Sequence, residues 1–352
     1  MRICTVVGAR PQFIKAAPVS RALAAQGLRE TLVHTGQHYD FGMSDIFFEE
    51  LRIRQPDYDL GVGSGSHGAQ TGQILIQVEE VLIAEKPDWV LVYGDTNSTL
   101  AGALAAVKLH IPVAHVEAGE RSYNRAMPEE HNRVLTDHAA DLLFCATQTT
   151  VQNLAAEGLY QGVHLVGDVM YDATLHYAPI AAEKVDPLNR LGLSPQAYYL
   201  ATIHRPYNTD VQQNLTNILN AFAQAPYPVI FPIHPRTRKS IHLYGLDVAS
   251  NVRVVDPMGY LDMLMLVKHA RAILTDSGGV QKEAYFNAVP CVTIRPETEL
   301  VETVRSGWNT LAQPTPQSIL AALSRPRPGG TPPSLFGDGN AAQRIAEIIA
   351  RS

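Results

Sequence analysis

The sequence has few cysteines and no long apolar run. Only three cysteines occur in 352 residues, Cys4, Cys145 and Cys291, and none forms a CxxC pair. Each lies in an apolar segment, and an odd number cannot pair completely within one chain, so we interpret them as core residues in a reduced compartment. No stretch approaches the roughly 18 apolar residues of a membrane span, and Met1 to Val7 is too short for a signal-peptide core. We therefore expect a cytoplasmic protein without a membrane partner.

Excess basic charge is also absent. With 28 Lys and Arg residues against 34 Asp and Glu residues, the chain has a formal net charge of -6 at pH 7. A protein that binds nucleic acid by electrostatic attraction normally has a basic face, so this composition argues against nucleic acid as a partner. An anionic ligand would have to be held by local hydrogen-bond donors.

Short β-branched runs alternate with helix-length segments along the chain, which predicts parallel βαβ units. The pattern restarts after Asp186-Pro187, so we predict an α/β protein with two doubly wound parallel-sheet domains, residues 1–170 and 187–330. The segment from Arg325 to Pro333 is rich in proline and glycine and is interpreted as a connector. A final helix within residues 338–352 is expected to pack back on the first domain. The predicted strands are residues 3–7, 31–34, 89–93, 113–116, 142–145 and 164–166, then 198–203, 229–233, 252–255, 272–274 and 291–294.

A phosphate-binding loop is indicated after the apolar run 272–274. Thr275-Asp-Ser277-Gly278-Gly279 places two glycines and a hydroxyl group at the expected start of a helix. Backbone N–H groups and the positive end of the helix dipole could face an anion there, and glycine allows close approach. Glu283, about one turn inside the helix, could accept hydrogen bonds from a ribose diol. The segment could equally be a tight turn with a capped helix.

Basic side chains follow other predicted strands. Arg10 follows the first strand, with Lys15 one turn into the next helix, and His204 and Arg205 follow the first strand of the second domain. The planar guanidinium group suits phosphate oxygens, and histidine can donate to one. A single Arg or Lys is more often a solvated surface charge, but their recurrence after strands favours a role in binding.

Three acidic residues lie where ligands of open parallel sheets bind, beyond the carboxyl ends of strands. Asp95 and Glu117 follow two apolar runs, and Glu129 opens the next helix. Acids in a closed cleft can have pKa values pushed apart, so that one removes a proton and another returns one. Asp95 could instead belong to the cap of a helix that begins at Thr99, and Glu129 could be an ordinary acidic helix start. Glu117 has no obvious capping role.

Two weaker patterns carry no assignment. The segment Gly61-Val-Gly63-Ser-Gly65 lacks a preceding strand and the final glycine of a dinucleotide fingerprint, so we expect a mobile loop. His131 beside two glutamates, and the pair His234 and His242, match no zinc spacing. We therefore predict no metal.

Nine short motifs occur in order over nearly the whole chain. They are Gly8-Ala-Arg-Pro-Gln-Phe-Ile-Lys15, His34-Thr-Gly-Gln-His38, Tyr93-Gly-Asp-Thr96, His115-Val-Glu-Ala-Gly119, Met127-Pro-Glu-Glu130, Thr202-Ile-His-Arg205, His234-Pro235, Thr275-Asp-Ser-Gly-Gly279 and Pro290-Cys-Val-Thr293. Together they resemble the non-hydrolysing UDP-N-acetylglucosamine 2-epimerases. The resemblance implies the glycosyltransferase-B arrangement, two Rossmann-like domains with an active site in the cleft between them.

The resemblance implies inversion at C2 of a UDP-linked 2-acetamido sugar, by elimination and re-addition of UDP, without metal or nicotinamide. By motif, Asp95, Glu117 and Glu129 would share the acid and base duties, with His204 near the diphosphate. The family's binding residues would correspond to Arg10, Lys15, Arg205, Ser277, Gly278 and Gly279 for the diphosphate, Glu283 for the ribose, and the backbone from Asp256 to Met263 for the uracil.

The sequence departs from the family's pattern at several positions. Glu120 stands where relatives commonly have leucine, Tyr207 where many have glutamate, and His131 replaces an apolar residue. A carboxylate so close to Glu117 would raise the proton affinity of one of the two. Gln73 stands where relatives often have arginine, which weakens the case for the family's second, regulatory UDP-sugar site near Gln37 and His38.

The implied substrate is UDP-N-acetylglucosamine, which would give UDP-N-acetylmannosamine. The opening motif is also similar to that of relatives that act on UDP-2,3-diacetamido-2,3-dideoxy-glucuronate, so this sugar is the alternative. A glycosyltransferase of the same fold and a non-catalytic UDP-sugar sensor are further alternatives. Because the family tends to dimerise, we also expect a homodimer.

Overall fold

The computed structural model describes residues 1–37, 51 and 53–352. The chain forms two compact units, unit 1 from Met1–Leu175 and Ser334–Ser352, and unit 2 from His176–Pro333. The division falls within the helix α7 (Val169–Lys184), which begins at the end of the first predicted domain and ends before the second.

Unit 1 is built on a seven-stranded parallel sheet in the order β3-β2-β1-β4-β5-β6-β7. Apart from the added edge strand β7, this is the strand order of a doubly wound nucleotide-binding fold, which reverses direction between β1 and β4. The strands are β1 Arg2–Val7, β2 Arg29–His34, β3 Tyr58–Asp59, β4 Trp89–Tyr93, β5 Val113–Val116, β6 Leu142–Cys145 and β7 Val163–Leu165.

Two details of this unit correct the sequence predictions. The short strand β3 was not predicted, and it precedes Gly61, so the statement that no strand comes before that glycine-rich segment was wrong. The helix after β4 begins at Asn97 rather than Thr99. Its cap is Thr96, whose hydroxyl group accepts from the Thr99 N–H group at 3.3 Å, so the carboxylate of Asp95 is not needed as a cap.

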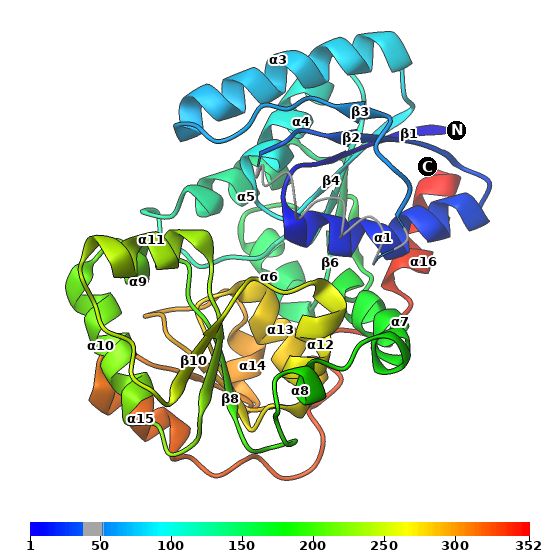
Figure 1. Ribbon diagram of the computed structural model, residues 1–352. Helices are drawn as coiled ribbons and strands as arrows, with labels where there is room; N and C mark the ends of the chain where they lie inside the picture. The colour runs from blue at the N-terminus through cyan, green and yellow to red at the C-terminus, as the bar shows by residue number, and fades with distance from the viewer. Residues whose placement is uncertain (38–50, 52) are drawn as a thin grey trace. The chain divides into compact units, whose positions relative to one another are not determined.

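Helices cover both faces of the first sheet, and the last helix of the chain packs beside the first (Figure 1). Ala342, Ile345, Ala346 and Ile349 of this last helix are buried, and the backbone N–H of Ala342 donates to Asp172 at 2.7 Å. The helices with described bounds are α1 Arg10–Ala25, α3 His67–Glu85, α4 Asn97–Lys108, α5 Pro128–Ala139, α6 Gln148–Ala156, the first part of α7, and α16 Ala341–Arg351.

Unit 2 repeats the doubly wound order with six parallel strands, β10-β9-β8-β11-β12-β13. The strands are β8 Tyr199–Thr202, β9 Val229–Pro232, β10 Val252–Val255, β11 Ala272–Thr275, β12 Cys291–Thr293 and β13 Asn309–Leu311, of which β13 was not predicted. The helices are α8 Pro187–Arg190, α9 Pro206–Thr209, α10 Gln212–Ala223, α11 Pro235–Leu243, α12 Tyr260–His269, α13 Gly278–Phe286, α14 Val301–Arg305 and α15 Pro316–Leu323.

The three cysteines are buried and free, as the sequence analysis interpreted them. Cys4 lies in β1, Cys145 in β6 and Cys291 in β12. Burial, the largest effect, raises the pKa of each thiol to about 12. All three therefore stay protonated and unreactive at neutral pH. In the described part of the chain, no helix is both long and apolar enough to cross a bilayer.

Candidate functional site

Two of the predicted residues of unit 1 meet beyond the carboxyl ends of β1 and β5. Glu117, directly after β5, forms an ion pair with Lys15 of α1. Both side chains are largely buried, with 4% of Glu117 and 13% of Lys15 exposed. A buried carboxylate is tolerated where a cation compensates its charge, so the ion pair with Lys15 holds the Glu117 side chain in place.

Gly94, the residue after β4, allows this ion pair to form. A Cβ atom at this position would lie 3.1 Å from Glu117 Oε2 and 3.4 Å from Lys15 Nζ. Its φ angle of 62° also lies in the left-handed region, which glycine adopts without steric cost. Gly94 therefore permits both the turn after β4 and the close approach of the charged pair.

Glu117 itself has a left-handed backbone, with a φ angle of 70°. A residue with a side chain pays a cost in this region, so its surroundings must fix it. The N–H groups of Glu117 and Ala118 both donate to the Phe144 carbonyl at 3.1 Å, which ties the turn to β6. The turn directs the chain away from the sheet with the carboxylate facing Lys15.

A buried ionic network also holds the turn at Glu117 in place. His115 Nδ1 lies 2.7 Å from Asp137 Oδ1, and His115 Nε2 lies 2.7 Å from the Gly94 carbonyl oxygen. Asp137 Oδ2 accepts from the N–H of Gly119 at 3.1 Å and from Arg121 at 2.7 Å. The network thus links the residues before and after Glu117 to α5.

The ionised form of Asp137 is favoured within this network. Burial, the largest effect, would raise its pKa, but the hydrogen bonds and charges of His115 and Arg121 outweigh it and lower the pKa below the usual 3.8. Burial alone would lower the pKa of the Arg121 guanidinium group. The hydrogen bonds and charges of Glu157 and Asp137 outweigh burial, so the pKa of Arg121 lies above its usual value.

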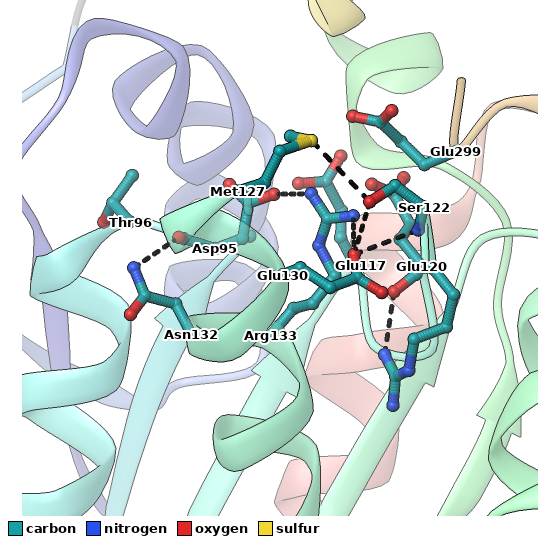
Figure 2. A network of polar contacts seen from close by, with 12 residues as sticks. Asp95, Thr96, Glu117, Glu120, Ser122, Met127, Glu130, Asn132, Arg133 and Glu299 are labelled. Atoms are coloured by element: carbon teal, nitrogen blue, oxygen red, sulfur yellow. Dashed lines mark hydrogen bonds and ion pairs between the residues drawn. The ribbon is translucent and has the colours of Figure 1, made fainter. Parts of the chain in front are cut away.

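Asp95 is held by α5. Figure 2 shows Arg133 extending from α5 toward Asp95 and Glu130, and it forms an ion pair with each. Arg133 is almost completely buried, whereas 29% of the Asp95 side chain is exposed. Asn132 adds a hydrogen bond of 3.0 Å to the Asp95 carbonyl oxygen. The buried guanidinium group of Arg133 therefore fixes the partly exposed carboxylate of Asp95 at the surface of unit 1.

Two neighbouring glutamates, Glu129 and Glu130, lie at the start of α5, and Glu130 binds the loop that precedes this helix. Glu130 is buried and accepts hydrogen bonds from the Ser122 N–H at 3.0 Å, the Ser122 hydroxyl group at 2.7 Å and the Tyr123 N–H at 2.8 Å. Glu129 is half-buried. Sequence reasoning assigned chemistry to Glu129 and overlooked the role of Glu130 in fixing the loop before α5.

In unit 2, the buried carboxylate of Asp276 organises the loop after β8. Its oxygens accept from the His204 N–H at 3.0 and 3.1 Å, the Arg205 N–H at 2.9 Å and the Asn208 amide at 3.0 Å. The His204 ring lies beside it, with Nδ1 at 3.5 Å from Asp276 Oδ1. Because β8 and β11 are neighbours, Asp276 joins the two loops at the point where the strand order reverses.

The glycine-rich loop follows β11 and leads into α13. Ser277 caps this helix, and its hydroxyl group accepts from the Val280 N–H at 3.5 Å. Gly278 and Gly279 form the first turn, where backbone N–H groups have no acceptor within the helix. Both a capped helix and an anion site use this geometry, so the two alternatives from the sequence are compatible. Glu283 is buried on α13, and Met263 of α12 packs against the core of unit 2.

Two further predicted residues of unit 1, Arg10 and Gln37, lie just after the carboxyl ends of β1 and β2. Arg10 begins α1 and is half-buried. Gln37 is buried, and its side-chain oxygen accepts from the Ser98 N–H at 2.9 Å and the Ser98 hydroxyl group at 2.6 Å. Gln37 therefore braces the start of α4 in this structure. His38, which the resemblance pairs with Gln37 in the family's regulatory site, lies outside the described residues.

Two doubly wound sheets, with polar residues gathered at the strand-order reversal of each, define a two-domain protein of the glycosyltransferase-B type. The chain belongs to the UDP-N-acetylglucosamine 2-epimerase family, whose model matches residues 21–350. It is 53% identical to a UDP-N-acetylglucosamine 2-epimerase homolog of Methanococcus maripaludis, over 99% of both chains.

Two further relatives are informative. The chain is 49% identical to the UDP-2,3-diacetamido-2,3-dideoxy-D-glucuronate 2-epimerase of Pseudomonas aeruginosa, over 100% of both chains. The crystal structure of the Methanocaldococcus jannaschii UDP-GlcNAc 2-epimerase in complex with UDP-GlcNAc and UDP matches with a TM-score of 0.94 and 42% identity, over 100% of both chains. The similarity thus extends over at least 99% of the length of each of these relatives.

Proposed function

We propose that this protein is a UDP-N-acetylglucosamine 2-epimerase, an isomerase that inverts C2 to give UDP-N-acetylmannosamine. The observation that carries the proposal is the buried Glu117 carboxylate, held by Lys15 at the end of β5 in a chain of this family. A carboxylate fixed in this way is suited to moving a proton at carbon, which requires a positioned base.

The reaction consists of an elimination and its reverse. A carboxylate removes the C2 proton, the C–H electron pair forms the C1=C2 bond, and UDP leaves with the electrons of the C1–O bond. Protonation of the resulting glycal on the opposite face and return of the UDP oxygen to C1 complete the inversion. Proton removal and return occur on opposite faces of the ring, so a base is needed on one face and an acid on the other. We assign these duties jointly to Asp95, Glu117 and Glu129 without dividing them among the three.

The cationic and glycine-rich loops would hold the leaving group. Donors aimed at the diphosphate stabilise the charge that develops as the C1–O bond breaks, and they retain UDP for the return step. His204, positioned by Asp276, would act near this diphosphate. We assign the remaining ligands as Arg10, Lys15, Arg205, Ser277, Gly278 and Gly279 for the diphosphate, Glu283 for the ribose, and the backbone of residues 256–263, which includes Met263, for the uracil.

A second candidate substrate is UDP-2,3-diacetamido-2,3-dideoxy-glucuronate. It is supported by the 49% identity to the Pseudomonas aeruginosa enzyme named for that sugar. The chemistry at C1 and C2 is the same for both sugars, so the acids and the diphosphate loops serve either one. The two substrates differ at C3 and C6, and specificity would be expressed as a ratio of their kcat/KM values.

The test is to incubate the protein with each UDP-sugar and to follow the products by NMR spectroscopy. The proposal predicts that the C2 epimer appears without added metal or nicotinamide, and that Glu117→Gln lowers kcat by about 10²- to 10⁴-fold. Release of UDP only when a sugar acceptor is supplied would instead indicate a glycosyltransferase. Tight binding without conversion of either sugar would indicate a UDP-sugar sensor.

We further infer that the protein acts as a homodimer in the cytoplasm. The exposed face of α3 supports the dimer, because Ile76 and Ile83 lie two helical turns apart on the same side and are 51% and 55% exposed. Exposed apolar side chains on one helix face are suited to contact with a second copy.

A further inference from the structure

A pocket lies within unit 2 at the amino ends of the strands, whereas the loops that carry His204 and Ser277 follow their carboxyl ends. It has a volume of about 490 Å³, and its lining includes Tyr199, Ala272 and Cys291, the first residues of β8, β11 and β12. The loops of the proposed active site follow the other ends of β8 and β11. The pocket is therefore separated from them by the length of these strands, on the order of 10 Å.

Three guanidinium groups line this pocket. Arg271 directly precedes β11, whereas Arg325 and Arg327 come from the proline- and glycine-rich segment that the sequence analysis interpreted only as a connector. Among the residues that the structure describes, none of the three forms an ion pair with a carboxylate. The pocket thus collects three positive charges without a negative partner.

Neutral groups hold these guanidinium groups in position. Arg325 donates to the Thr310 hydroxyl group at 3.3 Å, and Arg327 donates to the Gln196 amide oxygen at 3.2 Å and to the Ala288 carbonyl oxygen at 2.7 Å. The guanidinium carbon of Arg271 lies 4.3 Å from the centre of the Tyr227 ring. These contacts restrict the side chains but leave their charge available for an anion, which guanidinium groups bind through paired hydrogen bonds.

The rest of the lining combines a few neutral polar groups with apolar side chains. Val292, Trp308, Ala322 and Leu323 contribute to the lining, and Trp308 is almost completely buried. A volume of about 490 Å³ lies within the range of small-molecule sites, which combine apolar walls with a few polar groups that fix orientation. The lining therefore suits a ligand with an anionic group and a compact apolar or ring-shaped body.

We propose that this pocket binds a small phosphate ester. The phosphate group, with up to two negative charges and several acceptor oxygens, would contact Arg271, Arg325 and Arg327, and the body of the ester would lie against Val292 and Leu323. The site is distinct from the proposed UDP-sugar site and does not depend on the epimerase reaction.

Isothermal titration calorimetry tests this proposal. Glucose 6-phosphate, AMP and inorganic phosphate would each be titrated into the full-length protein in saturating UDP, which fills the proposed nucleotide site beforehand. At least one ester is expected to bind with one site per chain and more tightly than inorganic phosphate. The double variant Arg325→Gln/Arg327→Gln should weaken that binding at least tenfold.

Two controls make the outcome decisive. Arg351→Gln, at the exposed end of α16, removes a positive charge elsewhere and should leave ester binding unchanged. An unchanged unfolding midpoint of the double variant would show that it is folded, as expected for exposed side chains of a connecting segment. Equal binding by the wild type and the double variant, equal binding of phosphate and esters, or no binding of any ester at millimolar concentration would overturn the proposal.

Discussion

The turn at Glu117 shows how single residues shape the proposed site. Gly94 and Glu117 both have left-handed backbone angles, and the Gly94 backbone lies close to the Lys15–Glu117 pair. A side chain at position 94 would press on that pair. The glycine is therefore required by the geometry of the charged pair as well as by its own φ angle.

Substituting Gly94 by alanine separates these two effects. The left-handed angle should cost about 1–2 kcal/mol of unfolding free energy, and the added methyl group should also displace the Glu117 carboxylate and lower kcat. Gly27→Ala is the matched control, since Gly27 has a φ angle of 71° and no atom within 4 Å of the new Cβ. Denaturant unfolding and kinetics should show a similar loss of stability in both variants but a loss of activity only in Gly94→Ala. Equal kcat values would contradict the close contact.

A substitution of Asp137 tests the buried ionic network around Glu117. Asp137→Asn removes the buried negative charge that faces His115 and Arg121, although Arg121 keeps its ion pair with Glu157. We therefore expect a loss of about 3 kcal/mol in unfolding free energy, the lower end of the range for breaking a buried ion pair. Asp338→Asn, at an exposed ion pair, should have little effect. Denaturant titrations at pH 7 measure both, and similar values for the two variants would refute the structural role of Asp137.

The stabilisation by Asp137 should also depend on pH with a defined sign. Its pKa in the folded state lies below the usual 3.8, so its contribution is fully present above that value and is lost as the pH falls through the folded-state pKa. The difference in unfolding free energy between the wild type and Asp137→Asn should therefore narrow below about pH 3.8. A difference that widens in acid would contradict the assigned direction.

Among the elements, the loop after β8 depends on one carboxylate. In Asp276→Asn an amide N–H group would face backbone donors, which should cost about 1–3 kcal/mol and loosen the loop that carries His204 and Arg205. Under the proposed function, the KM for the UDP-sugar should rise and kcat should fall. Asp210→Asn, at the exposed end of α9, serves as the control and should leave both constants unchanged. Unaltered kinetics in Asp276→Asn would show that this loop does not contact the substrate.

The sequence predicts the elements well where strands are fully buried. The apolar runs of β4, β5 and β6 match their predicted bounds because every residue in them is buried. The strands β3 and β13 have two and three residues, too few for any periodic pattern to show. The doubly wound order follows from the alternation of strands and helices, which leaves few ways to cover both faces of a parallel sheet.

The contacts of the site could not be predicted in the same way. Lys15 and Glu117 are separated by 102 positions, and they meet only because β1 pairs with β4 and β4 pairs with β5. The choice between Glu129 and Glu130 depends on the phase of α5, because neighbouring residues of a helix face directions about 100° apart. Sequence reasoning located the loops but not the partner of each side chain.

For the whole molecule, the proposed dimer can be tested by substitutions on the exposed face of α3. Ile76→Glu/Ile83→Glu on α3 should convert a dimer into a monomer in sedimentation equilibrium, because charge would be buried in the contact. Leu243→Glu, at a position of unit 2 that is 70% exposed, is the matched control and should stay dimeric. A monomeric wild type, or a double variant that remains a dimer, would exclude this face as the interface.

The most direct measurement for the whole protein is solvent deuterium exchange at C2. UDP-N-acetylglucosamine would be incubated with the protein in heavy water, and the recovered UDP-sugars would be examined by NMR spectroscopy and mass spectrometry. Proton removal at C2 predicts that deuterium enters C2 of both epimers, that Glu117→Gln loses this exchange, and that Glu347→Gln, on helix α16, retains it. Epimerisation without deuterium at C2, or full exchange in Glu117→Gln, would contradict the assigned role of Glu117.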